Sequence, residues 1–238
     1  MTVQLQRPLL MDVQRDRRGR VADALAVLDV AVKLLLLLSV MRVLVDPGWA
    51  NLEGKAPMAR AFMYPLWAMA VPVFWGVRSR VSAFPWLADL LVTLTCFTDI
   101  LGNRLGLYDS VVWFDDWMHV MNTALVSAAF VLLTVRESAA FTEIVEAAVS
   151  LGLTASLGWE LFEYATFLTR STEWTSAYSD TIGDLVLGWL GSVLAALVVA
   201  AAWRHPTAGR GVPLRGRVTA GRGGGRRESP SRLAPPRR

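Results

Sequence analysis

The stretch LVLGWLGSVLAALVVAAAW, residues 185–203, contains no charged side chain and is long enough to cross a lipid bilayer. A helix needs about 20 apolar residues to cross the roughly 30 Å of hydrocarbon in a membrane. Similar blocks recur upstream, and the chain as a whole is 54% hydrophobic with a mean hydropathy of +0.40. Barrel strands would instead alternate apolar and polar residues over about 10 positions, a pattern that the sequence lacks. The sequence therefore predicts an all-α, polytopic bundle of transmembrane helices.

The apolar blocks predict about six spans between two basic segments. The spans are expected at residues 23–45, 61–77, 86–107, 117–135, 141–168 and 181–203. The second is short and holds Pro65 and Pro72, so we expect a kinked or tilted helix there. The transmembrane domain then covers 21–203. It follows a basic N-terminal segment at 1–20 and precedes a tail at 204–238 that is rich in Arg, Gly and Pro and is expected to be disordered.

The net charge of +4 conceals a partition along the chain. Residues 1–20 carry five Arg and two Asp, and residues 204–238 carry ten Arg and one Glu, so residues 21–203 hold a charge of −8. Cytoplasmic loops are enriched in Lys and Arg, which places both termini and the loops with Arg78 and Arg136 in the cytoplasm. The sequence thus predicts an N-in, C-in, multi-pass protein of the plasma membrane, the inner membrane of a bacterium.

The basic tails also indicate what the chain contacts. Anionic lipid headgroups attract such segments, and this explains the Arg-rich tail better than nucleic acid does, so no specific nucleic-acid partner is predicted. Cys96 is the only cysteine, which excludes an intrachain disulfide and a cysteine-based metal motif. The lipid bilayer is thus the predicted partner, and the oligomeric state stays open.

Polar residues recur in four of the spans at intervals of three or four positions. They are Asp99 and Asn103; Asp115, Asp116, His119 and Asn122; Glu160 and Glu163; and Asp180 and Asp184. Residues at these spacings share one face of a helix. In the predicted topology all four faces lie within roughly 12 Å of the outer boundary. Charged groups are costly in hydrocarbon, so we expect the four faces to meet inside the bundle as a carboxylate-rich chamber with one histidine.

A divalent metal ion would account for this concentration of carboxylates. Glu160, Glu163 and Asp99 lie toward helix C-termini, where the helix dipole disfavours anions. Carboxylates with an imidazole suit Zn, Mn, Fe or Mg. The predicted ligands are Asp99, Asp115, Asp116, His119, Glu160, Glu163, Asp180 and Asp184.

Simpler roles compete with ligation at several of these positions. Asp115 or Asp116 and Asp180 stand at helix N-termini, where aspartate is a favourable cap. Asp99 has Arg104 five positions further on, and a plain ion pair between them is the alternative to a metal ligand.

The same groups supply candidate catalytic residues. His119, with Asp115 and Glu163, is suited to proton transfer near neutral pH. Substrate binding is predicted for two cations and two amides on the same side of the membrane, Arg104, Arg170, Asn103 and Asn122.

Three motifs in this order resemble the YjdF-like family of bacterial inner-membrane proteins. They are Phe114-Asp115-Asp116-Trp-Met-His119, Trp159-Glu160-x-x-Glu163-Tyr164 and Asp180-Thr-x-x-Asp184. The resemblance covers about residues 99–195 and implies a multi-span helical architecture, with no particular reaction. This chain is shorter than the family in the acidic loop before the last span, where it has only Ser176-Ala-Tyr-Ser-Asp180.

Three functions fit the sequence. The first is a metal-dependent hydrolase or transferase acting on a lipid or an envelope precursor at the outer leaflet. The second is a scaffold or assembly factor without catalysis, in which the polar faces fix helix register. The third is a proton- or cation-coupled transporter. The almost wholly apolar inner halves of the fourth and sixth spans, at 126–135 and 190–202, count against a path of acids across the membrane.

Overall fold

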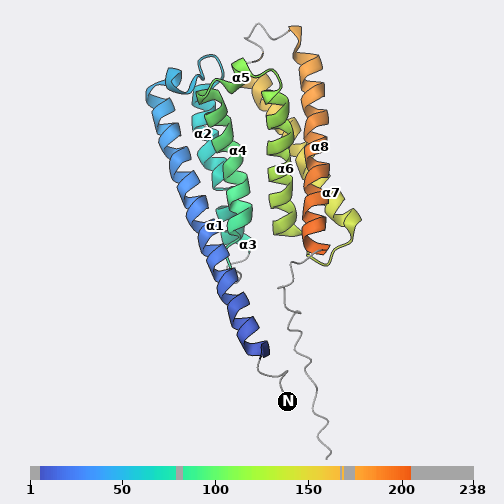
Figure 1. Cartoon of the computed structure of the whole chain (residues 1–238). Helices are drawn as coiled ribbons and strands as arrows, with labels where there is room; N and C mark the ends of the chain where they lie inside the picture. The colour runs from blue at the N-terminus through green and yellow to red at the C-terminus, as the bar shows by residue number, and fades with distance from the viewer. Residues whose placement is uncertain (1–5, 79–82, 167, 169–174, 205–238) are drawn as a thin grey trace, which may run out of the picture. The chain divides into compact units, whose positions relative to one another are not determined.

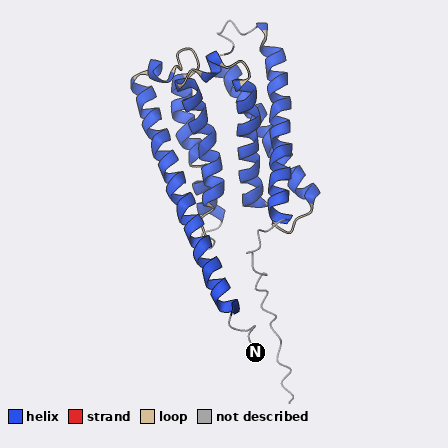
Figure 2. Ribbon diagram, in the orientation of Figure 1, coloured by secondary structure: helices blue, strands red, loops and turns tan. Residues whose placement is uncertain are grey.

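The structure is a computed structural model that describes residues 6–78, 83–166, 168 and 175–204. Over these residues the chain is helical and contains no strand (Figure 2). The α-helices are α1 (Gln6–Val45), α2 (Pro57–Ala68), α3 (Ala70–Arg78), α4 (Trp86–Arg104), α5 (Leu107–Ser110), α6 (Phe114–Thr134), α7 (Phe141–Thr166) and α8 (Ala177–Arg204), and a short 3-10 helix, η1, covers Pro47–Ala50. The predicted all-α fold is confirmed. The tail predicted to be disordered lies outside the described residues.

Four of the described helices are long and apolar enough to cross a membrane, namely α1 over Gly19–Val45, α6, α7 and α8. The chain is therefore an integral membrane protein. The other two predicted spans differ from a plain apolar helix. The span at 61–77 is divided into α2 and α3 at Met69, after the internal Pro65, and α4 carries Asp89 and Asp99 in its apolar stretch.

The helices form two neighbouring groups (Figure 1). Helices α1 to α4 pack together, α6 to α8 pack together, and α4 packs on α6 between the groups. We call the end of the bundle at which α4 ends and α6 begins the site end, which is uppermost in Figure 1. The opposite end, at which α4 begins and α8 ends, is the tail end.

The first group is held by an apolar stripe along α1. Val32, Leu36, Val40 and Val43 recur at helical spacing and are buried, so α1 presents one face to its neighbours. Leu36, Val40 and Val43 join a core that includes Cys96 and other residues of α2 and α4. Leu34, Leu35, Leu37 and Leu38 of α1 are exposed, as expected of a helix whose other faces contact lipid.

The second group is held by small residues. A side chain at Gly191 of α8 would collide with the backbone carbonyl of Val120 on α6, so these two helices touch backbone to backbone. A side chain at Gly152 of α7 would likewise collide with the hydroxyls of Ser192 and Ser127. Close approach through small residues is the usual way in which helices pack in membranes, where burial of apolar side chains gives no advantage over lipid.

We expect Gly191→Ala to destabilise the protein, because the added methyl group meets backbone that has no freedom to move aside. Overpacking of this kind costs about 1–3 kcal/mol. The measurement is the thermal unfolding midpoint of the purified protein in detergent. Gly158→Ala is the matched control, because a Cβ at Gly158 has no atom within 4 Å. Equal midpoints for the two variants would contradict the close contact of α6 and α8.

Candidate functional site

Three helices bring ionisable groups around His119 at the site end. His119 is on α6 and is only 7% exposed. Its Nε2 atom lies 3.6 Å from Asp184 Oδ1 of α8 and 3.8 Å from Asp115 Oδ1, one turn earlier on α6. Its Nδ1 atom lies 3.8 Å from Glu160 Oε1 of α7. The imidazole is therefore surrounded by three carboxylates from three helices.

Small side chains below His119 let the three helices approach one another. Thr123 and Ser127 continue its face of α6 at four-residue steps, and Ser156 continues the face of Glu160 on α7. Gly188 occupies the matching position on α8, where any side chain would collide with Ser156. The site therefore rests on a narrow, closely packed seam of small residues.

Four buried oxygens in this region have no hydrogen-bond partner among the described residues. They are Glu160 Oε1, Asn122 Oδ1 and the hydroxyl oxygens of Ser127 and Ser156. Buried polar atoms in folded proteins are almost always satisfied. A carboxylate oxygen left without a donor beside an imidazole indicates a place for a proton, a water molecule or a cation.

A second group of polar residues is centred on Asp99 of α4. The hydroxyl of Tyr64 donates to its Oδ2 atom, and the hydroxyl of Tyr108 donates to Oδ1 over 2.9 Å. The guanidinium of Arg60 lies 3.6 Å from Oδ2. Asp99 is only 4% exposed, so this buried carboxylate has two hydroxyl donors and one cation.

The two groups are joined by α7. Glu160 and Glu163 are three positions apart on one face of this helix, and each meets a different group. Glu160 faces His119, whereas Glu163 Oε1 lies 3.7 Å from Arg60 Nη2. Arg60 is 4% exposed and also lies 5.3 Å from the centre of the Trp159 ring. The two glutamates thus have different partners, His119 for Glu160 and Arg60 for Glu163. Through its contacts with Asp99 and Glu163, Arg60 links α2 to both α4 and α7.

Five of the predicted ligands, Asp99, Asp115, His119, Glu160 and Asp184, come together in these two groups, and Glu163 adjoins them. Asp116 and Asp180 are exposed, near the starts of α6 and α8. They are not among the atoms that gather around His119.

The predicted substrate-binding residues are dispersed. Asn103 is buried and donates to the backbone carbonyl of Asp99, a local bond within α4. Arg104 is exposed, with its guanidinium 5.1 Å from the centre of the Trp49 ring. The cation beside Asp99 is therefore Arg60 rather than the Arg104 that the sequence suggested. Arg170 lies outside the described residues.

Sequence reasoning missed Arg60, Tyr64 and Tyr108. Arg60 falls one residue before the predicted second span at 61–77, whereas α2 already begins at Pro57. The spacing of Arg60 and Tyr64, one turn apart, was the available signal, because it places a cation and a hydroxyl on one helix face. Tyr108 lies in the four-residue helix α5, which is too short for spacing to carry such information.

An ion pair at the site end joins the loop before α2 to the short helix α5. The ammonium of Lys55 lies 3.0 Å from Asp109 Oδ1, and Asn51 also donates to Asp109. The hydrogen bond from Lys55 lowers the pKa of Asp109 below its ordinary value. Lys55 thus makes a structural contact at the site end.

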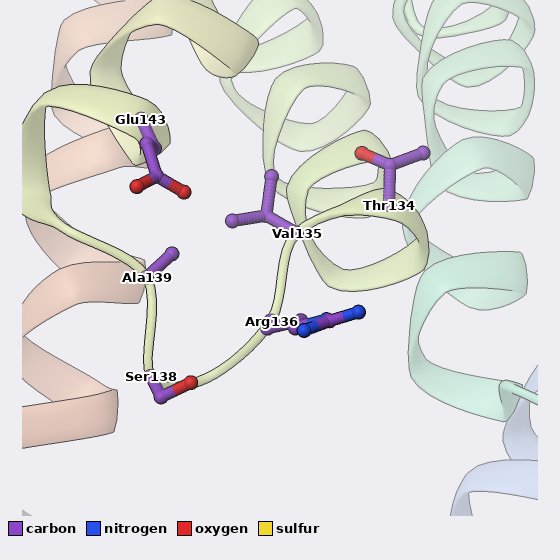
Figure 3. Close-up of a pocket in the computed structure, with 6 residues that line it drawn as sticks. All are labelled: Thr134, Val135, Arg136, Ser138, Ala139 and Glu143. Atoms are coloured by element: carbon purple, nitrogen blue, oxygen red, sulfur yellow. The ribbon is translucent and has the colours of Figure 1, made fainter.

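A hollow lies at the tail end, in the turn from α6 to α7 (Figure 3). It is lined by Thr134, Val135, Arg136, Ser138, Ala139 and Glu143. The side chains of Arg136 and Glu143 point in different directions there and do not converge on one point. This hollow therefore lacks the converging groups that the site end has.

Residues 30–205 match the family described as "Predicted membrane protein (DUF2238)". The chain belongs to this family. The match confirms the resemblance to YjdF-like membrane proteins and covers both groups of polar residues. No curated protein and no solved structure matches the chain. The family description identifies a membrane protein and names no activity.

We expect Arg60→Met to lower the free energy of unfolding by about 3–5 kcal/mol, because Asp99 and Glu163 would lose the cation that compensates their charge. The measurement is denaturant unfolding in detergent, followed by tryptophan fluorescence. Arg104→Met is the control, since an exposed cation–π contact contributes about 0.5–1 kcal/mol. If the two variants were equally stable, the buried ion pairs of Arg60 would contribute no more than a surface contact.

Proposed function

We propose that this protein is a metal-dependent membrane enzyme whose ion is held by Asp115, His119 and Asp184. The observation that carries the proposal is that one ligand atom from each of these residues lies within 4.8 Å of the other two. His119 and Asp184 are buried and come from different helices, so their proximity results from tertiary packing. Local spacing alone would have paired only Asp115 and His119.

The distances fit a shared ion. Zinc ligands lie about 2.0–2.2 Å from the metal, so two ligands in tetrahedral geometry are about 3.4 Å apart. The separations of His119 Nε2 from Asp184 and Asp115 are 3.6 and 3.8 Å. Small side-chain movements would bring these atoms to ligand distance. A set of one nitrogen and two carboxylates suits Zn, Mn, Fe or Mg.

Glu160 has a different part in this arrangement. When His119 uses Nε2 as a ligand, its Nδ1 atom carries the proton, and metal-bound histidines commonly donate that proton to a carboxylate. Glu160 Oε1 lies 3.8 Å from Nδ1 and has no hydrogen-bond partner in the described part of the chain. Its proposed role is thus to orient the imidazole rather than to ligate.

Among the candidate reactions we favour hydrolysis. A bound ion supplies activation of water and polarisation of a carbonyl or phosphoryl oxygen. Asp115 is the half-exposed member of the set, with a side chain 49% exposed, so substrate would approach from its side. Glu163, partly exposed and held by Arg60, is the candidate to accept a proton from water. The site lies near one end of membrane-spanning helices, which favours a lipid or an envelope precursor as substrate.

We expect purified protein to contain about one divalent ion per chain, measured by elemental analysis with and without prior chelation. Asp184→Asn and His119→Ala remove ligands and should abolish retention of the ion. Glu160→Gln should weaken affinity about 10–100-fold, the effect typical of a lost orienting partner.

Asp116→Asn is the matched control for these variants, because Asp116 is on the same helix as His119 but is exposed. The metal proposal fails if wild-type protein retains no ion. It also fails if Asp116→Asn loses the ion as readily as Asp184→Asn.

The proposed topology has six crossings with both termini in the cytoplasm of a bacterium. In this arrangement α2 and α3 together form one broken crossing, and α4 another, with its 19 residues covering about 28 Å. The site end then faces away from the cytoplasm. The basic loop residues at the tail end, Arg78 and Arg136, support this orientation.

Single cysteines in the loops test the crossing number, in a Cys96→Ala background. A membrane-impermeant maleimide applied to intact spheroplasts should label Glu53→Cys and Ser110→Cys. It should label Ala83→Cys and Ser138→Cys only after permeabilisation. Labelling of Glu53→Cys and Ala83→Cys from the same side would show that α2 and α3 do not cross the membrane.

A further inference from the structure

A second buried ionic cluster lies between α1 and α4, nearer the tail end. The ammonium of Lys33 lies 2.9 Å from Asp29 Oδ1 and 2.8 Å from Asp89 Oδ2. It also donates to the hydroxyl of Thr93 over 2.8 Å. Asp29 and Asp89 are each 1% exposed, so both carboxylates are removed from solvent and from lipid. This cluster shares no residue with the site around His119.

The charges in the cluster do not balance. One ammonium faces two carboxylates, and Asp89 Oδ1 is buried without a hydrogen-bond partner among the described residues. From α3 and α6, Val71 and Ala129 pack against this part of α4 in an apolar cluster. An isolated buried charge costs several kcal/mol, and a group in that position normally becomes neutral or gains a partner. The cluster therefore requires one further positive charge.

The geometry favours a proton over a metal ion as that charge. Lys33 occupies the centre of the available oxygens and uses its three donors on Asp29, Asp89 and Thr93. A metal ion would need several oxygen ligands and would be repelled by the ammonium at this distance. Asp89 Oδ1 offers one oxygen, which suffices for a proton.

We propose that Asp29, Lys33 and Asp89 form a proton-binding site, in which the carboxylates hold one proton between them and Asp89 Oδ1 is the atom that gains and loses it. The site exchanges protons with the tail-end side, since Lys33, with a side chain 18% exposed, is its accessible member. Thr93, which contacts Lys33 and lies 3.5 Å from Asp29 Oδ1, holds the members in place.

This site adds ionisable residues to the half of the membrane domain in which the sequence shows none in the fourth and sixth spans. The fourth and sixth spans lack ionisable groups in the half toward the tail end, but α1 and α4 supply them there. Asp89 and Asp99 lie on the same helix, ten positions and about 15 Å apart along its axis. One helix thus carries a proton-binding residue toward one membrane face and a buried carboxylate toward the other.

The test is infrared spectroscopy of full-length protein labelled with carbon-13 in its aspartates. The C=O stretching band of protonated carboxylic acid should lose the intensity of one group in Asp89→Asn. Asp29→Asn should lose the same intensity, because Lys33 and Asp89 then form a balanced pair that needs no proton. Asp46→Asn is the control, since Asp46 is exposed beside Arg42 and should leave the band unchanged.

Each variant of the cluster keeps one lysine with one carboxylate, so both are expected to fold, which gel filtration and circular dichroism check. An unchanged band in both Asp89→Asn and Asp29→Asn would overturn the proposal.

A second experiment compares the thermal unfolding midpoint of the protein in sodium chloride and in choline chloride. Stabilisation by sodium that is lost in Asp89→Asn would also overturn the proposal, because the cation would then be sodium. The Asp89→Asn and Asp29→Asn variants should both retain the divalent ion at His119, so this test is independent of the proposed metal site.

Discussion

A buried carboxylate in this bundle needs a nearby positive charge or proton. The contacts that supply it link particular pairs of helices. Burying an ionised carboxylate without a partner costs several kcal/mol, more than a single helix–helix contact supplies. Asp99 and Glu163 both lie beside Arg60, and Asp99 also accepts hydrogen bonds from two tyrosine hydroxyls, whereas Asp29 is paired with Lys33. The polar contacts therefore determine which helices are neighbours, while apolar and small residues determine how closely they approach.

Arg60 illustrates how one cation organises several elements. It lies on α2 and contacts a carboxylate on α4, a carboxylate on α7 and the ring of Trp159. The chain joins α2 to α7 only through many intervening residues, so the contact is long-range in sequence. Because α7 also carries Glu160, the position of Arg60 affects the geometry around His119. The two polar groups at the site end are thus one connected unit.

The packing of α6, α7 and α8 explains why a histidine and three carboxylates meet. Glycine and serine on the facing surfaces allow backbone contact, as at Gly191 against Val120. At that spacing, side chains one turn above the seam project into the same small volume. The apolar cluster that includes Val131, Ala148 and Ala196 fills the remaining part of these helices toward the tail end. The polar groups are thus concentrated at one end of this half of the bundle.

The sequence by itself determined that the chain is an all-helical membrane protein, because the length and apolar character of the blocks are properties of each helix alone. It also indicated that polar faces on four helices belong together, since spacings of three and four residues are local. The pairing of those faces was decided only by tertiary structure. His119 meets Asp184 and Glu160 because three helices converge, Asp99 is compensated by Arg60 of another helix rather than by nearby Arg104, and Asp89 meets Lys33 across α1 and α4. Sequence spacing reports which residues share a face, but the cation that compensates a buried acid depends on which faces meet, and that depends on the packing of the whole bundle.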